Sequence, residues 1–512
     1  MNIHLITQPF LDQFPGDFSD DTMQRQTPKM LFATVEPALF TNYKTITFNQ
    51  ELSNDIGLGS FEPEDEAFLA AQDLPKNIRT YATAYAGHQF GQWAGQLGDG
   101  RAILAGEIQN TSGETTEIQW KGAGATPYSR FADGRAVLRS SVREYLMSEA
   151  MHHLGVPTTR ALSLAETGEM VTRDILYNGN PKQEKGAVVI RTAPSFIRFG
   201  HFQLLTAQNE IDTLKNLADF CIQRYFREIK TDEPQPYHQF FKKIAETTAN
   251  LMVEWQRVGF THGVMNTDNM SILGLSIDYG PFSMLDEYDL NFTPNTTDLP
   301  GRRYAFGRQA EMAQWNLWQL GNALFPLIND VDFIEQTLED FGTDFWNQYD
   351  QMMCSKMGLD TFMKDTDVDF FTDWQNLMAS LKLDYTLFFN ALEKDVHLIN
   401  WQDISYQSLH TEDLQRLNQW INSYQNRLAL NKISPNERLA LMSQNNPKFT
   451  LRNYLLHECI KELNKGNISY FNQLLSALKK PYQETFPEWS VKRPKNTMRW
   501  WVALLCLVVL NN

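Results

Sequence analysis

The amino-acid sequence predicts an α+β fold with two lobes, a strand-rich N-lobe and a large helical C-lobe, with extensions at both ends. Three observations lead to this prediction. A glycine cluster is followed by two runs of strand type, and the second run ends at Lys121. Nearly all of the chain beyond residue 204 has helical patterning. A polar loop over residues 261–280 interrupts the helices and carries residue types that ligate metals.

The length of 512 residues is enough for about three domains. We expect an N-terminal wrapping segment, a kinase-like N-lobe that binds nucleotide, a helical C-lobe with the metal and catalytic loop, and a divergent tail. Their predicted bounds are 1–80, 81–203, 204–490 and 491–512.

The composition limits the function classes. The formal net charge is -16, from 45 basic and 61 acidic side chains, which argues against sequence-independent nucleic-acid binding. A local basic cluster could still hold a small polyanion such as ATP. The four cysteines show no CxxC spacing, so we expect no structural zinc site. Because cysteines are few in so long a chain, we expect a reducing compartment.

The two ends carry no targeting or membrane signal that we recognise. The N-terminus lacks a charged region followed by an apolar core, as a secretory signal would have. The apolar run Trp500–Leu510 is too short to span a bilayer, which takes about 20 residues. We therefore expect a cytoplasmic protein that does not bind membranes, and we interpret it as a monomer.

The glycine cluster lies between Tyr85 and Gly100, where bare backbone would let a ligand approach closely. Strands are predicted at 101–108 and 117–120, and Lys121 ends the second. A glycine loop, then a strand bearing Lys, is the order of a protein-kinase N-lobe. The kinase GxGxxG pattern is absent, and a glycine cluster alone is also typical of tight turns.

The tetrapeptide DGRA occurs twice, at residues 99–102 and 133–136. Each copy can present a guanidinium to phosphate, whose oxygens suit its planar fork. The alternative at either position is a solvated surface charge. The repeat is too short to establish an internal duplication.

A helix is predicted over Ser140–Leu154, capped by Ser140 or Ser141 and ended by Gly155. Glu144 is the candidate partner of Lys121, because kinases pair a helix Glu with the strand Lys. Glu149 is the second candidate. The alternative is an ordinary exposed glutamate.

Strands are predicted at 161–165, 170–174 and 187–192. Arg191 and Arg198 flank an apolar turn and could converge on one anion, or either could pair with an acidic neighbour. The helices expected beyond them are 209–227, 237–259 and 311–325, with Trp315 and Trp318 of the last in the core.

The loop THGVMNTDNMSILGLSIDYG has the outline of a kinase metal loop, with a predicted strand over Met270–Asp278. Kinases hold Mg²⁺ with a loop Asn and a later Asp, the positions of Asn269 and Asp278. Val264 occupies the usual base position and cannot accept a proton. Asp268 is the nearest carboxylate that can, which indicates nucleotide chemistry other than γ-phosphate transfer.

These motifs resemble the selenoprotein O family, protein adenylyltransferases with a kinase-like fold. The resemblance extends from the FPGD turn to about Pro487, and it is carried by YAGHQFGQWAGQLGDGRA, WKGAGATPYSRFADGRAVLRSSVREYL, RTAPSFIRFGHF and THGVMNTDNMSILGLSIDYGPFSMLDEYD. It implies a bilobal protein-kinase-like fold and transfer of AMP from ATP to Ser, Thr or Tyr hydroxyls of proteins. It further implies that ATP binds inverted relative to kinases.

The resemblance also implies roles for single residues. Asp268 would accept the proton, Asn269 and Asp278 would hold Mg²⁺ or Mn²⁺, and Glu144 would pair with Lys121. The implied nucleotide contacts are Gly98, Gly100, Arg101, Lys121, Asp133, Gly134, Arg191, Arg198 and Asp278.

The chain departs from the family pattern in two places. Many members end in a tail with Cys or selenocysteine near the last residue, whereas this chain ends TMRWWVALLCLVVLNN. Relatives often carry Cys where this chain has Thr293-Pro294, so a regulatory disulfide to Cys506 is not expected.

Three other functions stay open from the sequence. They are UMP transfer from UTP with Mn²⁺, phosphoryl transfer by a true kinase, and nucleotide binding by an inactive pseudokinase. Val264 argues against the second, and the presence of Asp268, Asn269 and Asp278 argues against the third.

Overall fold

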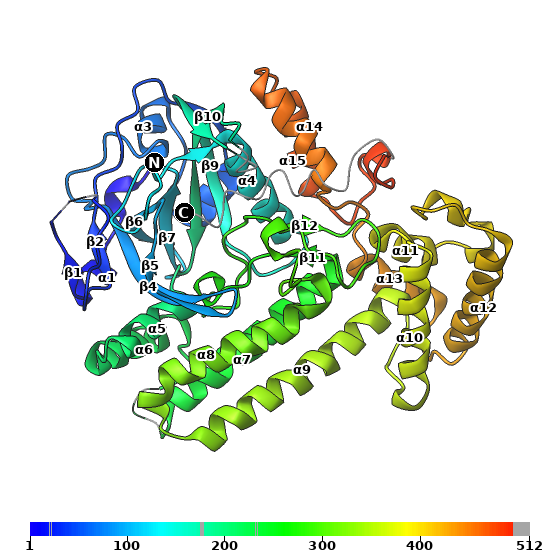
Figure 1. The fold of residues 1–512 in the computed structure, drawn as a ribbon. Coiled ribbons are helices and arrows are strands. Elements are labelled where there is room, and N and C mark those ends of the chain that lie inside the picture. Colours follow the sequence, from blue (N-terminus) through cyan, green and yellow to red (C-terminus); the bar gives the residue numbers. More distant parts are fainter. Residues whose placement is uncertain (20, 22, 175–178, 231, 233, 495–512) are drawn as a thin grey trace.

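The computed structural model describes residues 1–19, 21, 23–174, 179–230, 232 and 234–494. Over these residues the protein is a mixed α+β structure with one large sheet and many helices, so the predicted α+β class is confirmed (Figure 1). The apolar run Trp500–Leu510 and Cys506 lie outside the described residues.

Ten strands form the large sheet, and its main path runs β1-β2-β4-β6-β7-β10-β9-β3, with β5 paired to β4 and β8 to β10. The pairs are antiparallel except β1 with β2. The strands are β1 (Gly16–Asp17), β2 (Phe32–Thr34), β3 (Lys44–Phe48), β4 (Tyr81–Gln89), β5 (Gln92–Gly98), β6 (Ala102–Gln109), β7 (Thr115–Lys121), β8 (Ala136–Val137), β9 (Arg160–Arg173) and β10 (Lys182–Ala193). The first 80 residues thus supply strands at both ends of this path.

The predicted strands before and at Lys121 are present as β6 and β7, but two other predictions need correction. The runs 161–165 and 170–174 are one strand, β9. The glycine-rich segment is not a loop between strands; it forms the β4–β5 hairpin, which turns at Phe90 and Gly91. The hairpin forms because alternate small side chains of β4, Ala82, Ala84 and Ala86, are fully buried and give the strand a core face.

Helix α4 (Leu138–His153) packs against β9 and β10. It begins two residues before the predicted start, so Ser140 and Ser141 lie inside the helix and do not cap it. The cap residue is Val137, without a side-chain cap. Gly155 follows the helix with φ +81°, a backbone conformation that favours glycine, as the predicted end requires.

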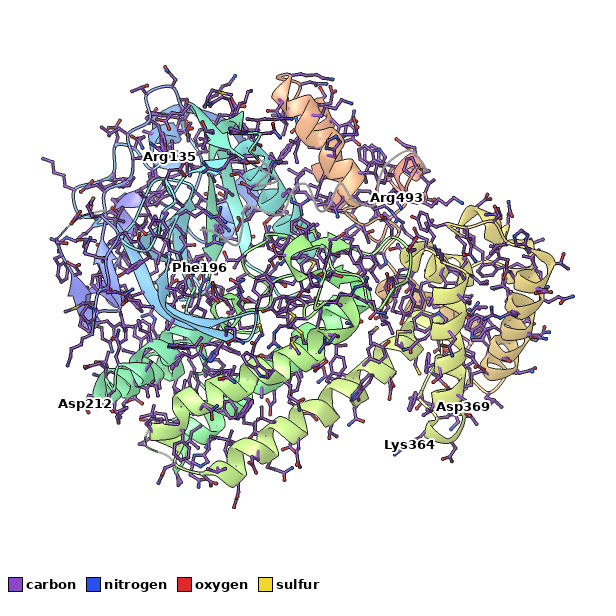
Figure 2. The ribbon with its side chains drawn as sticks, in the orientation of Figure 1. Arg135, Phe196, Asp212, Lys364, Asp369 and Arg493 are labelled. Carbon is purple, nitrogen blue, oxygen red and sulfur yellow. The ribbon has the colours of Figure 1, made fainter. Side chains whose placement is uncertain are left out.

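The second half of the chain is helical, as predicted, and α7, α8 and α9 pack on one another below the sheet in Figure 1. Figure 2 shows Phe196 where the sheet meets these helices, and Lys364 and Asp369 on α10 at the far side. The main helices are α5 (Phe199–Ala207), α6 (Ile211–Tyr225), α7 (Pro236–Val258), α8 (Gln309–Ile328), α9 (Val331–Met357), α10 (Lys364–Ser380), α11 (Tyr385–Leu392), α12 (Thr411–Leu428), α13 (Pro435–Asn445), α14 (Asn453–Asn464) and α15 (Ser469–Leu478).

Shorter elements complete the structure. They are α1 (Pro9–Gln13), α2 (Gln50–Asp55), α3 (Glu66–Leu69), the β11–β12 pair (Phe260–Thr261 and Ser283–Met284), and eight 3-10 turns, η1 (Ile3–Leu5), η2 (Pro63–Asp65), η3 (Thr267–Asn269), η4 (Thr296–Asp298), η5 (Phe306–Arg308), η6 (Val396–Leu398), η7 (Trp401–Asp403) and η8 (Pro487–Trp489).

Two further predictions in the helical half were wrong. Residues 270–278 are not a strand: they make only isolated bridges, and Gly274, with φ +63°, turns the chain in their middle. Trp318 is 50% exposed and Trp315 is half-buried, so neither is a core residue. The buried face of α8 is formed by Leu317, Leu320 and Leu324, and Trp318 points away from it.

No helix among the described residues combines the length and the apolar character needed to cross a membrane.

Candidate active site

A pocket lies where the hairpin β4–β5, strand β7, helix α4 and the loop 264–280 meet. Its lining includes nine of the predicted site residues, which come from segments far apart in the sequence. These are Gly98, Gly100, Arg101, Lys121, Glu144, Arg191, Asp268, Asn269 and Asp278.

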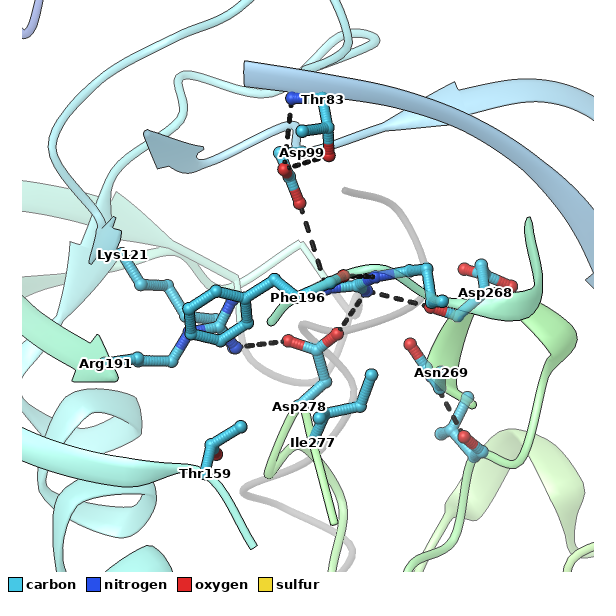
Figure 3. Close-up of polar contacts among 12 residues, drawn as sticks. Thr83, Asp99, Lys121, Thr159, Arg191, Phe196, Asp268, Asn269, Ile277 and Asp278 are labelled. Atoms are coloured by element: carbon cyan, nitrogen blue, oxygen red, sulfur yellow. Dashed lines mark hydrogen bonds and ion pairs between the residues drawn. The ribbon is translucent and has the colours of Figure 1, made fainter. Parts of the chain in front are cut away.

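Asp278 stands at the centre of the charges in this pocket (Figure 3). Its Oδ1 accepts from Arg191 Nη1 at 2.5 Å and from Lys121 Nζ at 3.2 Å, and its Oδ2 accepts from Arg198 Nη1 at 2.7 Å. Burial alone would raise the pKa of Asp278, but Arg198, Lys121 and Arg191 outweigh burial and hold that pKa well below its usual range. Asp278 is therefore a carboxylate at neutral pH. The two arginines do converge on one anion, which is this side chain.

Lys121 is held by α4. Its Nζ lies 2.8 Å from Glu144 Oε2, and Glu144 Oε1 lies 2.9 Å from Arg191 Nη1. Glu149, the second candidate, is turned away and pairs with Arg160 at 2.7 Å. Burial lowers the pKa of Lys121, while Glu144 opposes that effect. One helix residue thus orients two of the cations that line the pocket, Lys121 and Arg191.

Asp268 lies on η3 and is only 8% exposed. Burial raises the pKa of its carboxyl to about 6, although Gln89 Nε2 donates to Oδ2 at 3.2 Å. Oδ1 has no hydrogen-bond partner among the described residues. A carboxylate with a free oxygen and a raised pKa is a suitable proton acceptor near neutral pH.

Asn269 is oriented by its amide nitrogen, which donates to Val264 O at 2.9 Å. Its carbonyl oxygen is thereby left free to act as a ligand. Asn269 and Asp278 both line the pocket, and an amide oxygen with a carboxylate suits Mg²⁺ or Mn²⁺. The residues present fit a divalent ion that takes its other ligands from phosphate or water. No group of three or more His, Cys, Asp or Glu side chains within the described ranges offers a metal site made by protein alone.

Close packing against Tyr128 requires glycine at two of the predicted positions, Gly98 and Gly100. A Cβ at Gly98 would lie 2.4 Å from the Tyr128 ring, and one at Gly100 would lie 2.7 Å from Tyr128 O. Between them, buried Asp99 accepts from Thr83 N and Oγ1 at 3.1 and 2.6 Å. These contacts fix the turn that brings Arg101 to the pocket, where burial lowers the pKa of its guanidinium.

Three predicted nucleotide contacts, Asp133, Gly134 and Arg198, do not line this pocket. Asp133 forms an ion pair with Arg173 at 2.8 Å. Gly134 has φ +65°, and a Cβ there would lie 2.1 Å from Gly124 O, so backbone packing requires the glycine. Arg198 is buried behind Asp278.

Arg135 of the second DGRA copy also stays away from the pocket. It pairs with Glu169 at 3.1 Å and lies over the Phe40 ring. The two copies therefore differ: only the first places its arginine in the pocket.

Sequence reasoning missed Gln89, Asn266 and Tyr304. The OH of Tyr304 donates to Asn266 Oδ1 at 2.6 Å, and Phe90 N donates to the same oxygen at 3.1 Å. With His88 N donating to Thr267 Oγ1 at 2.7 Å, the hairpin is bonded to the Asp268 loop at three successive positions. The spacing THGVMNTDN locates the loop, but no pattern in it indicates its partner hairpin.

The comparisons with known proteins show the family of this chain. A family model described as protein adenylyltransferase SelO matches residues 19–479. The chain therefore belongs to the SelO family of nucleotidyltransferases, and the family resemblance predicted from the motifs is confirmed.

Curated relatives match over almost their whole length. The protein nucleotidyltransferase YdiU of Cytophaga hutchinsonii is 46% identical over 494 residues, covering 96% of this chain and 95% of the relative. The protein of the same name from Flavobacterium johnsoniae is 45% identical over 503 residues, covering 96% of each. That of Tolumonas auensis is 44% identical over 508 residues, covering 96% of this chain and 97% of the relative.

Proposed function

We propose that this protein is a protein adenylyltransferase, which transfers AMP from ATP to Ser, Thr or Tyr hydroxyls of other proteins. The observation that carries the proposal is the pairing of Asp268, a buried carboxyl with one unpartnered oxygen, with a cluster of cations around Asp278 in the same pocket. The matching family model and relatives are named as nucleotidyltransferases, which supports the same reaction class.

The arrangement suggests how the reaction would proceed. The acceptor hydroxyl attacks the α-phosphorus, its proton passes to Asp268, and the bond to the bridging oxygen of the β-phosphate breaks, so pyrophosphate leaves. Lys121, Arg191 and Arg101 are placed to stabilise the charge that develops on pyrophosphate. A divalent ion held by Asn269 and Asp278 would neutralise phosphate charge when bound. With Asp278 serving as a metal ligand, Lys121 and Arg191 can turn to phosphate.

This mechanism needs ATP to bind in the direction opposite to that in kinases. In kinases the γ-phosphoryl group faces the base of the catalytic loop. Here Val264 occupies that base position, whereas Asp268 is a carboxyl of the pocket lining with an oxygen that has no hydrogen-bond partner among the described residues. We therefore propose a bilobal, protein-kinase-like arrangement in which the sheet and α4 form the N-lobe and the helices from α5 onward form the C-lobe, with inverted ATP between them.

The test is to incubate the protein with cell extract and ATP labelled at the α or the γ phosphorus, with Mg²⁺ or Mn²⁺. We expect label on protein only from the α position, and none with Asp268→Asn or Asp278→Ala. Label from the γ position alone would show a kinase. Stronger labelling from α-labelled UTP would show a uridylyltransferase, and no labelling with retained ATP binding would show an inactive pseudokinase.

A further inference from the structure

The rim of the pocket beside Asp268 carries two exposed aromatic side chains and two partly buried arginines. We define the rim surface as Trp93, Arg130, Phe131 and Arg303. Phe131 is 99% exposed and Trp93 is 47% exposed, which is unusual for rings of this size. The ring of Trp93 packs edge-on against His88 at 5.0 Å, so it is held in place while its other side faces solvent.

Both arginines of the rim surface are connected to the proposed catalytic loop through one intermediate residue. Arg130 Nη2 donates to Gln89 Oε1 at 3.3 Å, and Gln89 Nε2 donates to Asp268 Oδ2 at 3.2 Å. Arg303 precedes Tyr304, whose OH donates to Asn266 Oδ1. The rim surface is therefore next to the place where an acceptor hydroxyl must enter.

Arg303 is held against the hairpin tip. Its guanidinium lies over the Trp315 ring at 4.5 Å, and a Cβ on Gly91 would lie 3.3 Å from its Cζ. Gly91 has φ +82°, so a side chain there would be strained for that reason as well. The stacking fixes the cation, and the glycine leaves room for it.

The arginines of the rim surface are not held in ion pairs within the described part of the chain. Neither Arg130 nor Arg303 forms an ion pair with a described residue. Asp298 is buried and interacts with Arg303 electrostatically, but its carboxylate accepts from the backbone N–H groups of Arg303 and Tyr304, at 2.9 and 2.8 Å. Two unpaired cations beside the site are notable in a chain of net charge -16.

The backbone at the rim is also held in an uncommon conformation. Phe90 at the hairpin tip has φ +51° and Arg130 has φ +54°. Residues other than glycine and asparagine rarely adopt this region, and such strain concentrates at binding sites. Phe131, which follows Arg130 in the chain, is the most exposed of the rim residues.

We propose that the rim surface binds the acceptor protein, through a segment that carries Asp or Glu beside the modified hydroxyl and an apolar residue next to them. The carboxylates pair with Arg130 and Arg303, and the apolar residue covers Phe131 and Trp93. This inference rests on the proposed function, because it specifies the substrate of that site. Charge complementarity with Arg130 and Arg303 selects an acidic acceptor segment over a basic one.

The test uses three fluorescent peptides with the same central Ser and the same apolar neighbour, flanked by Asp, Asn or Lys. Binding is measured by anisotropy without nucleotide, and AMP transfer is measured in parallel. We expect the Asp peptide to bind at least tenfold more tightly than the Lys peptide. Arg130→Glu combined with Arg303→Glu should reverse this order.

The matched control combines Arg227→Glu and Arg416→Glu, which changes the net charge equally at exposed positions near the end of α6 and on α12. It should keep the preference for the Asp peptide. Equal binding of all three peptides, or equal loss in the control, would overturn the inference. If the Asp peptide binds most tightly but AMP is transferred to none of the peptides, the proposed function is refuted and the role of the rim surface in binding acidic segments is kept. Dimerisation lost in the Arg130/Arg303 variant, without peptide binding, would show that a second copy occupies the surface.

Discussion

Arg198 and Asp278 form a buried ion pair in which Nη1 of the arginine lies 2.7 Å from Oδ2 of the carboxylate. The same Nη1 donates to the backbone carbonyl of Asp268 at 2.8 Å. One guanidinium nitrogen therefore fixes the proposed metal ligand relative to the proposed base. Asp278 itself has φ +55°, a conformation that costs energy and persists because the surrounding contacts hold it.

Replacement of Arg198 by Ala should therefore cost more stability than the loss of an ordinary ion pair. It leaves Asp278 buried with one cation fewer, and breaking a buried pair typically costs about 3–5 kcal/mol. The matched control is Arg308→Ala, because Arg308 pairs with Glu311 at 3.1 Å on the surface. That change should cost less than about 1 kcal/mol. Urea unfolding followed by circular dichroism measures both, and equal losses would contradict the role given to Arg198.

Glu117 allows a prediction that does not depend on the function. Burial raises its pKa to about 8 from the ordinary 4.5, although Phe196 N donates to it at 2.8 Å. Between these two pH values the folded protein binds a proton that the unfolded chain has released. The contribution of Glu117 to stability therefore falls as pH rises through this window, by up to about 1.4 kcal/mol per pH unit.

Glu117→Gln removes this titration and keeps an oxygen for Phe196 N. We expect the variant to be more stable than the wild type at pH 8 and nearly equal to it at pH 4.5. Thermal unfolding at a series of pH values tests this. A stability difference that does not change between pH 5 and pH 8 would show that Glu117 is not protonated in the folded protein.

Gln89 should set the pH range of the proposed reaction. The pKa of Asp268 is about 6, and the base must be ionised to accept a proton, so the rate should fall as pH drops below about 6. The hydrogen bond from Gln89 lowers that pKa, so Gln89→Leu should move the fall to higher pH. The control is Gln92→Leu on the same hairpin, at an exposed position. Identical pH–rate profiles for the two variants would exclude this role of Gln89.

The order of the motifs predicted much of this site. A strand Lys, a helix Glu and a loop with Asn and Asp are local patterns with known spacing, and the structure places Lys121, Glu144, Asn269 and Asp278 around one pocket. The strands β6 and β7 were also predicted from apolar runs, because a half-buried strand has a local signature.

Long-range pairing could not be predicted in this way. The glycine-rich segment was expected as a loop, because glycine favours turns, yet burial of Ala82, Ala84 and Ala86 makes β4 a strand. The contact of Gln89 with Asp268 joins residues 179 positions apart, and neither residue's neighbours indicate it. The exposure of Trp318 depends on which face of α8 packs inward. The sequence does not distinguish a tryptophan on the buried face from one on the neighbouring face.

Asp278→Asn should separate metal binding from the binding of phosphate. In the wild type the carboxylate of Asp278 attracts Lys121, Arg191 and Arg198, and it would repel ATP that arrives without a metal ion. The variant replaces a carboxylate ligand by a weaker amide ligand and loses this negative charge. We therefore expect metal-free ATP to bind about tenfold more tightly, roughly 1.4 kcal/mol, while Mg²⁺ no longer strengthens binding and transfer is lost. Calorimetric titration with and without Mg²⁺ measures this, with Asp133→Asn as the control, because Asp133 pairs with Arg173 outside the pocket. An unchanged effect of Mg²⁺ in Asp278→Asn would show that the ion is held by other residues.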